Sequence, residues 1–343
     1  MRHLLNSLFV TTEDAYLALD GENVVVRRAE TEMARFPLHT LESIIAFTYP
    51  GASPALMGAC AERGISLCFC TPRGRFLARV CGETSGNVLL RRTQYRLADD
   101  PTQSCTIARN MIFGKVHNAR WSVDRTLRDH GPRVNAAQME KALSRLRDAL
   151  PAIASVESLD SLRGLEGDAA SAYFGVFNEM ILKSKDLFFF QERNRRPPLD
   201  NVNAMLSFVY TLLGNDCASA LESVGLDAYV GFLHQDRPGR RSLALDLLEE
   251  LRPCFADRFV LTLINTGAVR DSDFDRRESG AVLLTGDGRK KLLKAWQERK
   301  KDTITHPFTN EKIPWGLVPY LQALLLARHL RGDMDGYPPF LWK

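Results

Sequence analysis

The chain has 343 residues, of which 45% are hydrophobic and 25% charged, and its formal net charge is +4. This composition is typical of soluble globular proteins and excludes a disordered or fibrous class, while the length suffices for two domains. No segment holds the roughly 18 apolar residues of a membrane span, so we expect a soluble, cytoplasmic protein that makes no membrane contact.

The first 85 residues are predicted to form a β-rich domain. Short apolar or alternating segments are separated by turn signals such as Asp20-Gly21 and Arg73-Gly74. We expect strands within residues 16–19, 24–26, 44–47, 65–69 and 76–80. A helix is expected over residues 54–63, because Pro54 stands at its start and Gly64 just beyond its end.

Residues 86–103 are predicted to be a linker to a larger helical domain, residues 104–343. The linker contains Gly86-Asn87 and Asp99-Asp100-Pro101, which are turn-forming sequences. Helical periodicity is found at residues 104–129, 135–149, 167–184, 201–214, 216–223, 242–252, 254–266, 286–301 and 316–330. The predicted fold class is therefore α+β with two domains, an N-terminal β-rich domain followed by a larger all-α catalytic domain.

The seven cysteines indicate neither a zinc site nor a disulfide framework. They contain no C-x-x-C pair and their number is odd. Free cysteines are compatible with a reducing cytosol.

Glu166 lies at the edge of an apolar helical arc that includes Ala169 and Tyr173. A carboxylate turned partly inward needs a cation, a metal or strong donors, because an unpaired buried charge is unfavourable by several kcal/mol. The alternative is a glutamate in the first helical turn, stabilised by the helix dipole and flanked by Gly164 and Gly167.

Asp246 and Glu249 are three residues apart in the predicted helix 242–252, opposite its leucine-rich face, and Pro253 is expected to stop this helix. Two carboxylates one turn apart can flank a divalent ion, although such pairs also occur on solvated helices. His234 ends the apolar run 229–233, where an imidazole can be a metal ligand or a hydrogen-bonded core residue. Together with Glu166 these residues offer mainly oxygen ligands, which favour Mg²⁺ or Mn²⁺ acting on a phosphodiester.

Basic residues occur in clusters that could contact nucleic acid or simply be solvated. The clusters are Arg91/Arg92, Arg193/Arg195/Arg196, Arg237/Arg240/Arg241, Lys290/Lys291/Lys294 and Arg299/Lys300/Lys301. The second is followed by Pro197-Pro198, which favours an extended approach, and by Asp200, which can cap the next helix. Its arginines have the geometry for bidentate phosphate contacts.

The order of these motifs resembles that of the CRISPR-associated spacer-acquisition integrase, the Cas-one family. The motifs are Leu165-Glu166-Gly167, then Arg196-Pro197-Pro198-x-Asp200-x-x-Asn203, then Leu233-His234 and Ser242-Leu243-Ala244-Leu245-Asp246-Leu247-x-Glu249-x-x-Arg252-Pro253. The resemblance extends over nearly the whole chain and is closest to the I-C subtype.

The resemblance implies an integrase and endonuclease that inserts captured foreign DNA into a CRISPR array by attack of a 3′-hydroxyl on the repeat phosphodiester. It implies Glu166, His234 and Glu249 as metal ligands, with Asp246 as a nearby catalytic carboxylate that could exchange roles with Glu249. It further implies an asymmetric homodimer, two such dimers around a Cas-two dimer, and binding of prespacer and repeat DNA. Asn203 and Tyr173 lie in matching motifs and are candidates for strand placement or for support of the ligands.

Two other functions are also compatible with these residues. One is a stand-alone metal-dependent DNase acting on branched or linear DNA. The other is a non-catalytic DNA-binding scaffold, which would leave Glu166 without a functional partner. The C-terminal segment 336–343, rich in proline and aromatic residues, is expected to anchor on the chain's own surface or on a partner, the first being favoured.

Overall fold

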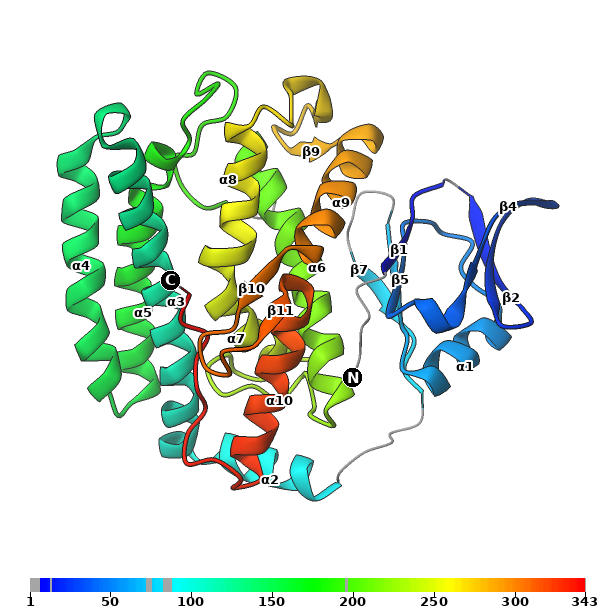
Figure 1. The fold of residues 1–343 in the computed structure, drawn as a ribbon, viewed down its shortest axis with the longest axis horizontal. Coiled ribbons are helices and arrows are strands. Elements are labelled where there is room, and N and C mark those ends of the chain that lie inside the picture. The colour runs from blue at the N-terminus through cyan, green and yellow to red at the C-terminus, as the bar shows by residue number, and fades with distance from the viewer. Residues whose placement is uncertain (1–6, 13, 72–75, 83–87, 195–196, 343) are drawn as a thin grey trace. The chain divides into compact units, whose positions relative to one another are not determined.

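A computed structural model describes residues 7–12, 14–71, 76–82, 88–194 and 197–342. The chain divides into two compact units (Figure 1). The first comprises Met1–Gly86, Ser272–Asp275 and Leu283–Asp302, and the second comprises Asn87–Asp271, Arg276–Val282 and Thr303–Lys343. A strand-rich N-terminal region is thus followed by helices, which confirms the α+β class. Helix α9 (Gly286–Lys301) was expected within the helical domain but is part of the first unit.

The first unit contains two sheets. In one, β1 (Ser7–Val10), β5 (Ser43–Ala46) and β6 (Ser66–Cys70) are parallel and β7 (Phe76–Arg79) is antiparallel to β6. In the other, β2 (Ala15–Asp20), β3 (Asn23–Arg28) and β4 (Thr31–Pro37) form an antiparallel meander. Helix α1 (Pro54–Arg63) begins at the capping hydroxyl of Ser53 and ends at Gly64, whose φ of +68° is easily adopted by glycine.

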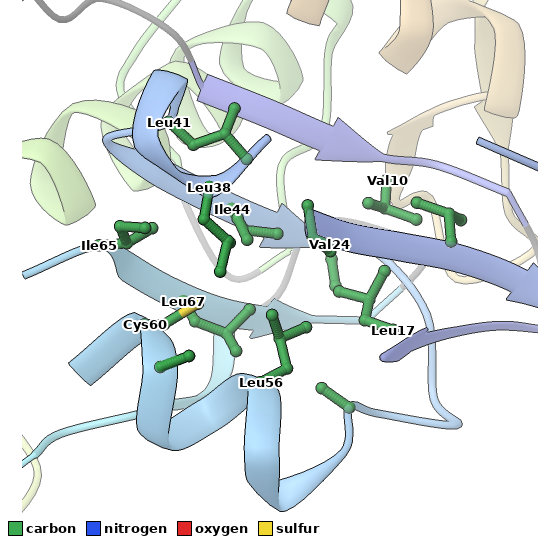
Figure 2. Packing of buried hydrophobic residues seen from close by; sticks show 14 of the residues in the cluster. Val10, Leu17, Val24, Leu38, Leu41, Ile44, Leu56, Cys60, Ile65 and Leu67 are labelled. Atoms are coloured by element: carbon green, nitrogen blue, oxygen red, sulfur yellow. The ribbon is translucent and has the colours of Figure 1, made fainter. Parts of the chain in front are cut away.

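The core of this unit lies between the sheets and α1. Leu17, Val24, Ile44, Leu56 and Leu67 are fully buried there, and Figure 2 shows their side chains converging. These are alternate or helically spaced apolar positions, and their burial is the main favourable contribution to folding of the unit.

The second unit is built from long helices. They are α2 (Val88–Asp99), α3 (Pro101–His130), α4 (Ala136–Ser155), α5 (Leu159–Gly175), α6 (Asn201–Ser223), α7 (Ser242–Leu251), α8 (Arg258–Asn265) and α10 (Val318–Leu330). Helix α3 packs against α4, α5 and α7, while α6 packs against α7 and α10 (Figure 1). Short strand pairs complete the chain: β8 (Phe274–Arg276) with β9 (Val282–Leu284), and β10 (Thr303–Thr305) with β11 (Lys312–Pro314).

Local signals explain where these helices begin. The Asp100 carboxylate accepts hydrogen bonds from the backbone N–H groups of Thr102 and Gln103, and Pro101 is the first residue of α3. Asp200 caps α6 in the same way through the N–H of Asn203 at 2.7 Å, as its sequence position predicts.

Residues 86–103 were expected to be a linker, but 88–99 form helix α2. The side chain of Gln94 is buried, and its amide donates to the carbonyls of Asp227 and Val230 at 2.8 and 2.9 Å. Tertiary hydrogen bonds of this kind stabilise helix α2, although the turn-forming sequences on either side of it suggested a linker.

Within the described part of the chain, no helix is both long and apolar enough to cross a bilayer.

The α-helix before Pro253 ends, as predicted, but the helical path of the chain is not broken there. Helix α7 stops at Leu251, but the chain continues through a π-helical segment, Arg252–Asp257, into α8. The wider π turn allows the proline to be accommodated without a break. It also directs the side chains of Arg252 and Asp257 into the interior, where both contribute to the site described next.

Candidate active site

Glu166 and Glu249 converge on one ammonium group, that of Lys115. Lys115 extends from α3 and forms ion pairs with Glu166 Oε1 of α5 and with Glu249 Oε2 of α7, the second at 2.6 Å. The side chains of Lys115 and Glu249 are 10% and 8% exposed, and that of Glu166 is 27% exposed. Three helices therefore bring two acids that are remote in sequence to a single cation.

The position of Glu166 decides between its two expected roles. It lies in the middle of α5, which begins at Leu159 and is capped by Ser158, so the first-turn interpretation is wrong. Glu166 pairs with the Lys115 cation, which is the kind of partner that a partly buried carboxylate needs. The sequence did not identify Lys115, although one signal was present: Lys115 lies one turn from the buried residues Ile112 and Ala119, and a lysine on an apolar stripe requires a counter-charge.

Glu249 is also held by Arg252, whose Nη1 donates to its two oxygens at 2.8 and 3.1 Å. Burial alone would raise the pKa of Glu249, but the charges of Arg252 and Lys115 outweigh it and hold the pKa well below its ordinary value. Glu249 is therefore ionised throughout the physiological range.

Asp246 is fully buried and its carboxylate organises the loop that carries His234. It accepts hydrogen bonds from the backbone N–H groups of Phe232, Leu233 and His234 at 2.7, 3.0 and 3.1 Å. Its Oδ1 also lies 2.5 Å from His234 Nδ1. An ionised carboxylate can only accept, so Nδ1 must carry a proton, and Nε2 then presents a lone pair in the neutral ring.

The expectation that Asp246 and Glu249 project together from the face opposite the leucines is wrong, and so is the alternative of a solvated pair. Both are buried, and they point to different partners: Asp246 to the loop 232–234 and Glu249 to Lys115 and Arg252. A spacing of three residues places two side chains on neighbouring parts of a helix surface without requiring them to share a ligand.

Arg252 connects the acids to a second buried cluster. Its guanidinium lies 4.4 Å from the ring centroid of Tyr210. Tyr210 and Tyr173 donate through their hydroxyls to the two oxygens of Asp257, at 2.5 and 3.1 Å. Burial raises the pKa of Asp257, opposed by Arg252 and by both hydroxyls. This cluster fixes Arg252, and Arg252 in turn fixes Glu249.

Tyr173 and Asn203 are buried, and their polar atoms have partners inside the protein. Asn203 Nδ2 donates to Asp200 at 2.6 Å, and its Oδ1 accepts from Arg193 at 2.6 Å. Burial is incompatible with a direct DNA contact of these two side chains in this conformation. The supporting role that was also expected for them fits their positions.

The basic residues expected at DNA differ in exposure. Arg193 is half-buried, donates to Asn203 and Ser207, and lies over Tyr210, so it is integrated into the fold. Arg195 and Arg196 lie outside the described residues. Arg237 is exposed, whereas Arg240 and Arg241 are half-buried and Arg241 donates to Asn215 at 2.8 Å. A cavity of about 450 Å³ lies beside His234 and is bordered by residues 98–104 and 157–163.

The chemistry of the donors fits a divalent cation. Within the described ranges, no group of three or more His, Cys, Asp and Glu side chains is arranged as a metal site. The Lys115 ammonium pairs with both carboxylates, where it acts as a stand-in for a cation. Two hard oxygen donors and an imidazole fixed in the metal-binding tautomer are a donor set that suits Mg²⁺ or Mn²⁺.

The C-terminal segment anchors on the chain's own surface, as favoured from the sequence. The Tyr337 hydroxyl and the Phe340 N–H donate to the carboxylate of Glu250, the second at 2.8 Å. Asn118 of α3 donates to the Phe340 carbonyl and accepts from the Trp342 N–H, both at 2.8 Å. The segment, red in Figure 1, thereby ties α3 to α7, the helices that carry Lys115 and Glu249.

Replacing Glu250 by Gln is expected to change how stability depends on pH. Burial raises the pKa of Glu250 from 4.5 to about 7, although hydrogen bonds from Tyr337, Phe340 and Gln322 oppose this. Because the pKa is higher in the folded state, Glu250 makes the free energy of unfolding fall by roughly 3 kcal/mol as pH rises from 4.5 through 7. Urea unfolding at pH 5 and pH 7.5 should show this loss in the natural chain and not in Glu250→Gln. Equal pH dependence of the two proteins would contradict the assignment.

The mainly helical unit of this α+β chain thus gathers two acids on a buried lysine and a histidine oriented by a third acid. The family model described as CRISPR associated protein Cas1 matches residues 8–298. The chain belongs to the Cas1 family of CRISPR-associated endonucleases, the family indicated by the motif order.

Curated relatives match over the full length of both chains. A CRISPR-associated endonuclease Cas1 of Rhodospirillum rubrum is 53% identical over 347 residues, and one of Chlorobaculum tepidum is 48% identical over 343, each covering 100% of both proteins. Among solved structures, a casposase bound to integration product has a TM-score of 0.81 at 23% identity, with 98% of this chain and 94% of that chain covered. A Cas1 protein of Thermotoga maritima has a TM-score of 0.80 at 19% identity, with 98% and 100% covered.

Proposed function

We propose that the chain is a metal-dependent DNA integrase and endonuclease that inserts captured DNA fragments into a CRISPR array, by attack of a fragment's 3′-hydroxyl on the repeat phosphodiester. The observation that carries this is the convergence of Glu166 and Glu249 on one cation, together with a His234 imidazole whose Nδ1 pairs with Asp246 and leaves Nε2 available. Family membership supplies the CRISPR context. The I-C subtype remains a prediction, which the neighbouring CRISPR genes would test.

We assign Glu166, Glu249 and Nε2 of His234 as the ligands of one Mg²⁺ or Mn²⁺. When bound, such an ion supplies Lewis acidity to the attacked phosphate and to the attacking oxygen. Asp246 is a positioning residue, because its four hydrogen bonds fix the tautomer and direction of His234 and occupy its own oxygens. Under this division of roles, Glu249 is the proposed direct ligand of the two acids on α7.

The remaining side chains orient DNA and hold the ligands. Arg252 keeps Glu249 ionised and directed, and is itself held by Tyr210 and Asp257. Exposed Arg237, with Arg240 and Arg241 beside it, is available for phosphate contacts. The cavity beside His234 offers space for the nucleotide that flanks the attacked phosphate.

The proposed partners are prespacer and repeat DNA and the Cas2 protein, with two homodimers per integration complex. Family membership motivates these partners, and one relative of this fold was solved as a Cas6-RT-Cas1–Cas2 complex. We place homodimer pairing on the N-terminal unit, where Tyr16, Met33 and Phe36 are exposed on β2 and β4. A cytoplasmic location accompanies this proposal.

A strand-joining assay tests the function. The natural chain with Cas2, a labelled duplex and a plasmid carrying a CRISPR repeat is expected to join DNA in Mn²⁺ and not in EDTA. Cleavage without joining, unchanged by Cas2, would instead identify a stand-alone DNase. Binding of the duplex with neither reaction, and no rise in melting temperature with Mn²⁺, would identify a scaffold.

A further inference from the structure

We propose that Lys115 closes the metal site in the absence of DNA, and that a DNA phosphate opens it by attracting the ammonium group away from the two glutamates. The inference rests on the proposed metal site and adds a regulatory role for a residue that the metal-binding motif does not include. Its basis is that the ammonium contacts the same two carboxylates that would bind the ion.

Lys115 and a divalent ion cannot use these oxygens together. The ammonium is 2.6 Å from Glu249 Oε2 and also contacts Glu166 Oε1, so it occupies the space between the acids. An ion at coordination distance from both oxygens, roughly 2.0–2.1 Å for Mg²⁺, would lie in that same space. Steric overlap and like-charge repulsion therefore make the two occupants alternatives.

The charges around the site also make the Lys115 ammonium and a divalent ion alternatives. Glu166 and Glu249 carry two negative charges, the Lys115 ammonium pairs with both, and Arg252 is shared between Glu249 and Asp257. A divalent ion added beside the ammonium would bring like charges together in a largely buried site. Arg252 is restrained by Tyr210 and Asp257, whereas contacts to the Lys115 ammonium are made by the two glutamates, so Lys115 is the cation that can leave.

A DNA phosphate can replace the two glutamates as the partner of the displaced ammonium. A backbone phosphate brought to the site adds negative charge and accepts hydrogen bonds from a lysine on a flexible stem. Binding of DNA and binding of the ion are then coupled, and by linkage each must increase the affinity for the other. The consequence is a nuclease centre that is poorly loaded with metal until a substrate is present.

The test measures Mn²⁺ binding, by electron paramagnetic resonance of the free ion, with and without a duplex whose 3′ ends are dideoxy and cannot react. For the natural chain, the duplex should tighten Mn²⁺ binding at least about tenfold. Lys115→Met should bind Mn²⁺ at least about tenfold more tightly than the natural chain without DNA, and the duplex should add less than about threefold. Lys115→Arg retains a cation and should bind Mn²⁺ no more tightly than the natural chain.

The matched control is Lys141→Met, which removes an exposed lysine from α4 and should behave as the natural chain does. Equal Mn²⁺ affinity of Lys115→Met and the natural chain, with Glu166→Gln weaker than both, would overturn the inference and leave the metal site standing. No Mn²⁺ binding by any of these proteins would overturn the metal site itself. If Lys115→Met does not fold, Lys115→Gln and the DNA dependence of the natural chain decide the question.

Discussion

Replacing His234 by Ala is expected to reduce metal-dependent strand joining by roughly 10³-fold or more, equivalent to about 4 kcal/mol of transition-state stabilisation. The change removes the nitrogen ligand but leaves Glu166, Glu249 and their ion pairs with Lys115 intact. Folding and duplex binding should therefore be preserved. The initial rate of joining in Mn²⁺ with Cas2 measures the loss, and the matched control is His39→Ala, which removes an exposed imidazole.

Asp246→Asn refines this prediction, because it keeps His234 and removes its anchor. The amide cannot accept from three N–H groups and Nδ1 as the carboxylate does, so the imidazole loses its fixed direction. We expect a smaller loss, about 10–100-fold in metal affinity or rate. An equal loss in both variants would mean that Asp246 is itself a ligand, and full activity of His234→Ala would contradict the assigned site.

Replacing Glu249 by Gln is expected to lower the free energy of unfolding of the metal-free protein by about 3 kcal/mol. Removing one member of a buried ion pair typically destabilises by 3–5 kcal/mol, because the other charge is left without compensation. Here Lys115 and Arg252 both lose a partner. The expected value is at the lower end because Glu166 still pairs with Lys115 and Asp257 still compensates Arg252.

Urea unfolding in EDTA measures the effect of Glu249→Gln. The exposed Glu140→Gln on α4 should leave stability unchanged, and Glu166→Gln should destabilise less, because Glu166 is more exposed. The double variant Glu249→Gln with Lys115→Met should recover part of the loss, since it removes both charges of one pair. Unaltered stability of Glu249→Gln would show that these ion pairs do not form in solution.

Much of the architecture follows from periodicity and from local capping signals. The helix 54–63 was predictable because Pro54 and Gly64 mark its ends, and the strands around Ile44 and Leu67 because apolar residues there are bounded by turns. Helix α2 was missed because Gln94, which fixes it, pairs with carbonyls more than 130 residues away. Such contacts leave no local trace in the sequence.

The sequence predicted acids and a histidine for the candidate site but not the side chains with which they pair. The motifs identified Glu166, His234 and Glu249, yet the roles of Asp246 and Lys115 depend on which helices face each other. A spacing of three residues on α7 suggested a shared ligand, whereas packing directs Asp246 to the histidine loop and Glu249 to Lys115. Pro253 suggested a helix end, but the π turn of residues 252–257 carries the chain onward.

A crystal of the protein grown with DNA and Mn²⁺, with diffraction measured at the manganese absorption edge, addresses the metal assignment without reference to activity. One anomalous peak is expected within bonding distance of Glu166, Glu249 and Nε2 of His234, with the Lys115 ammonium moved away from both carboxylates. Absence of a peak among these three side chains, with Lys115 still between the glutamates in saturating Mn²⁺, would contradict the metal assignment.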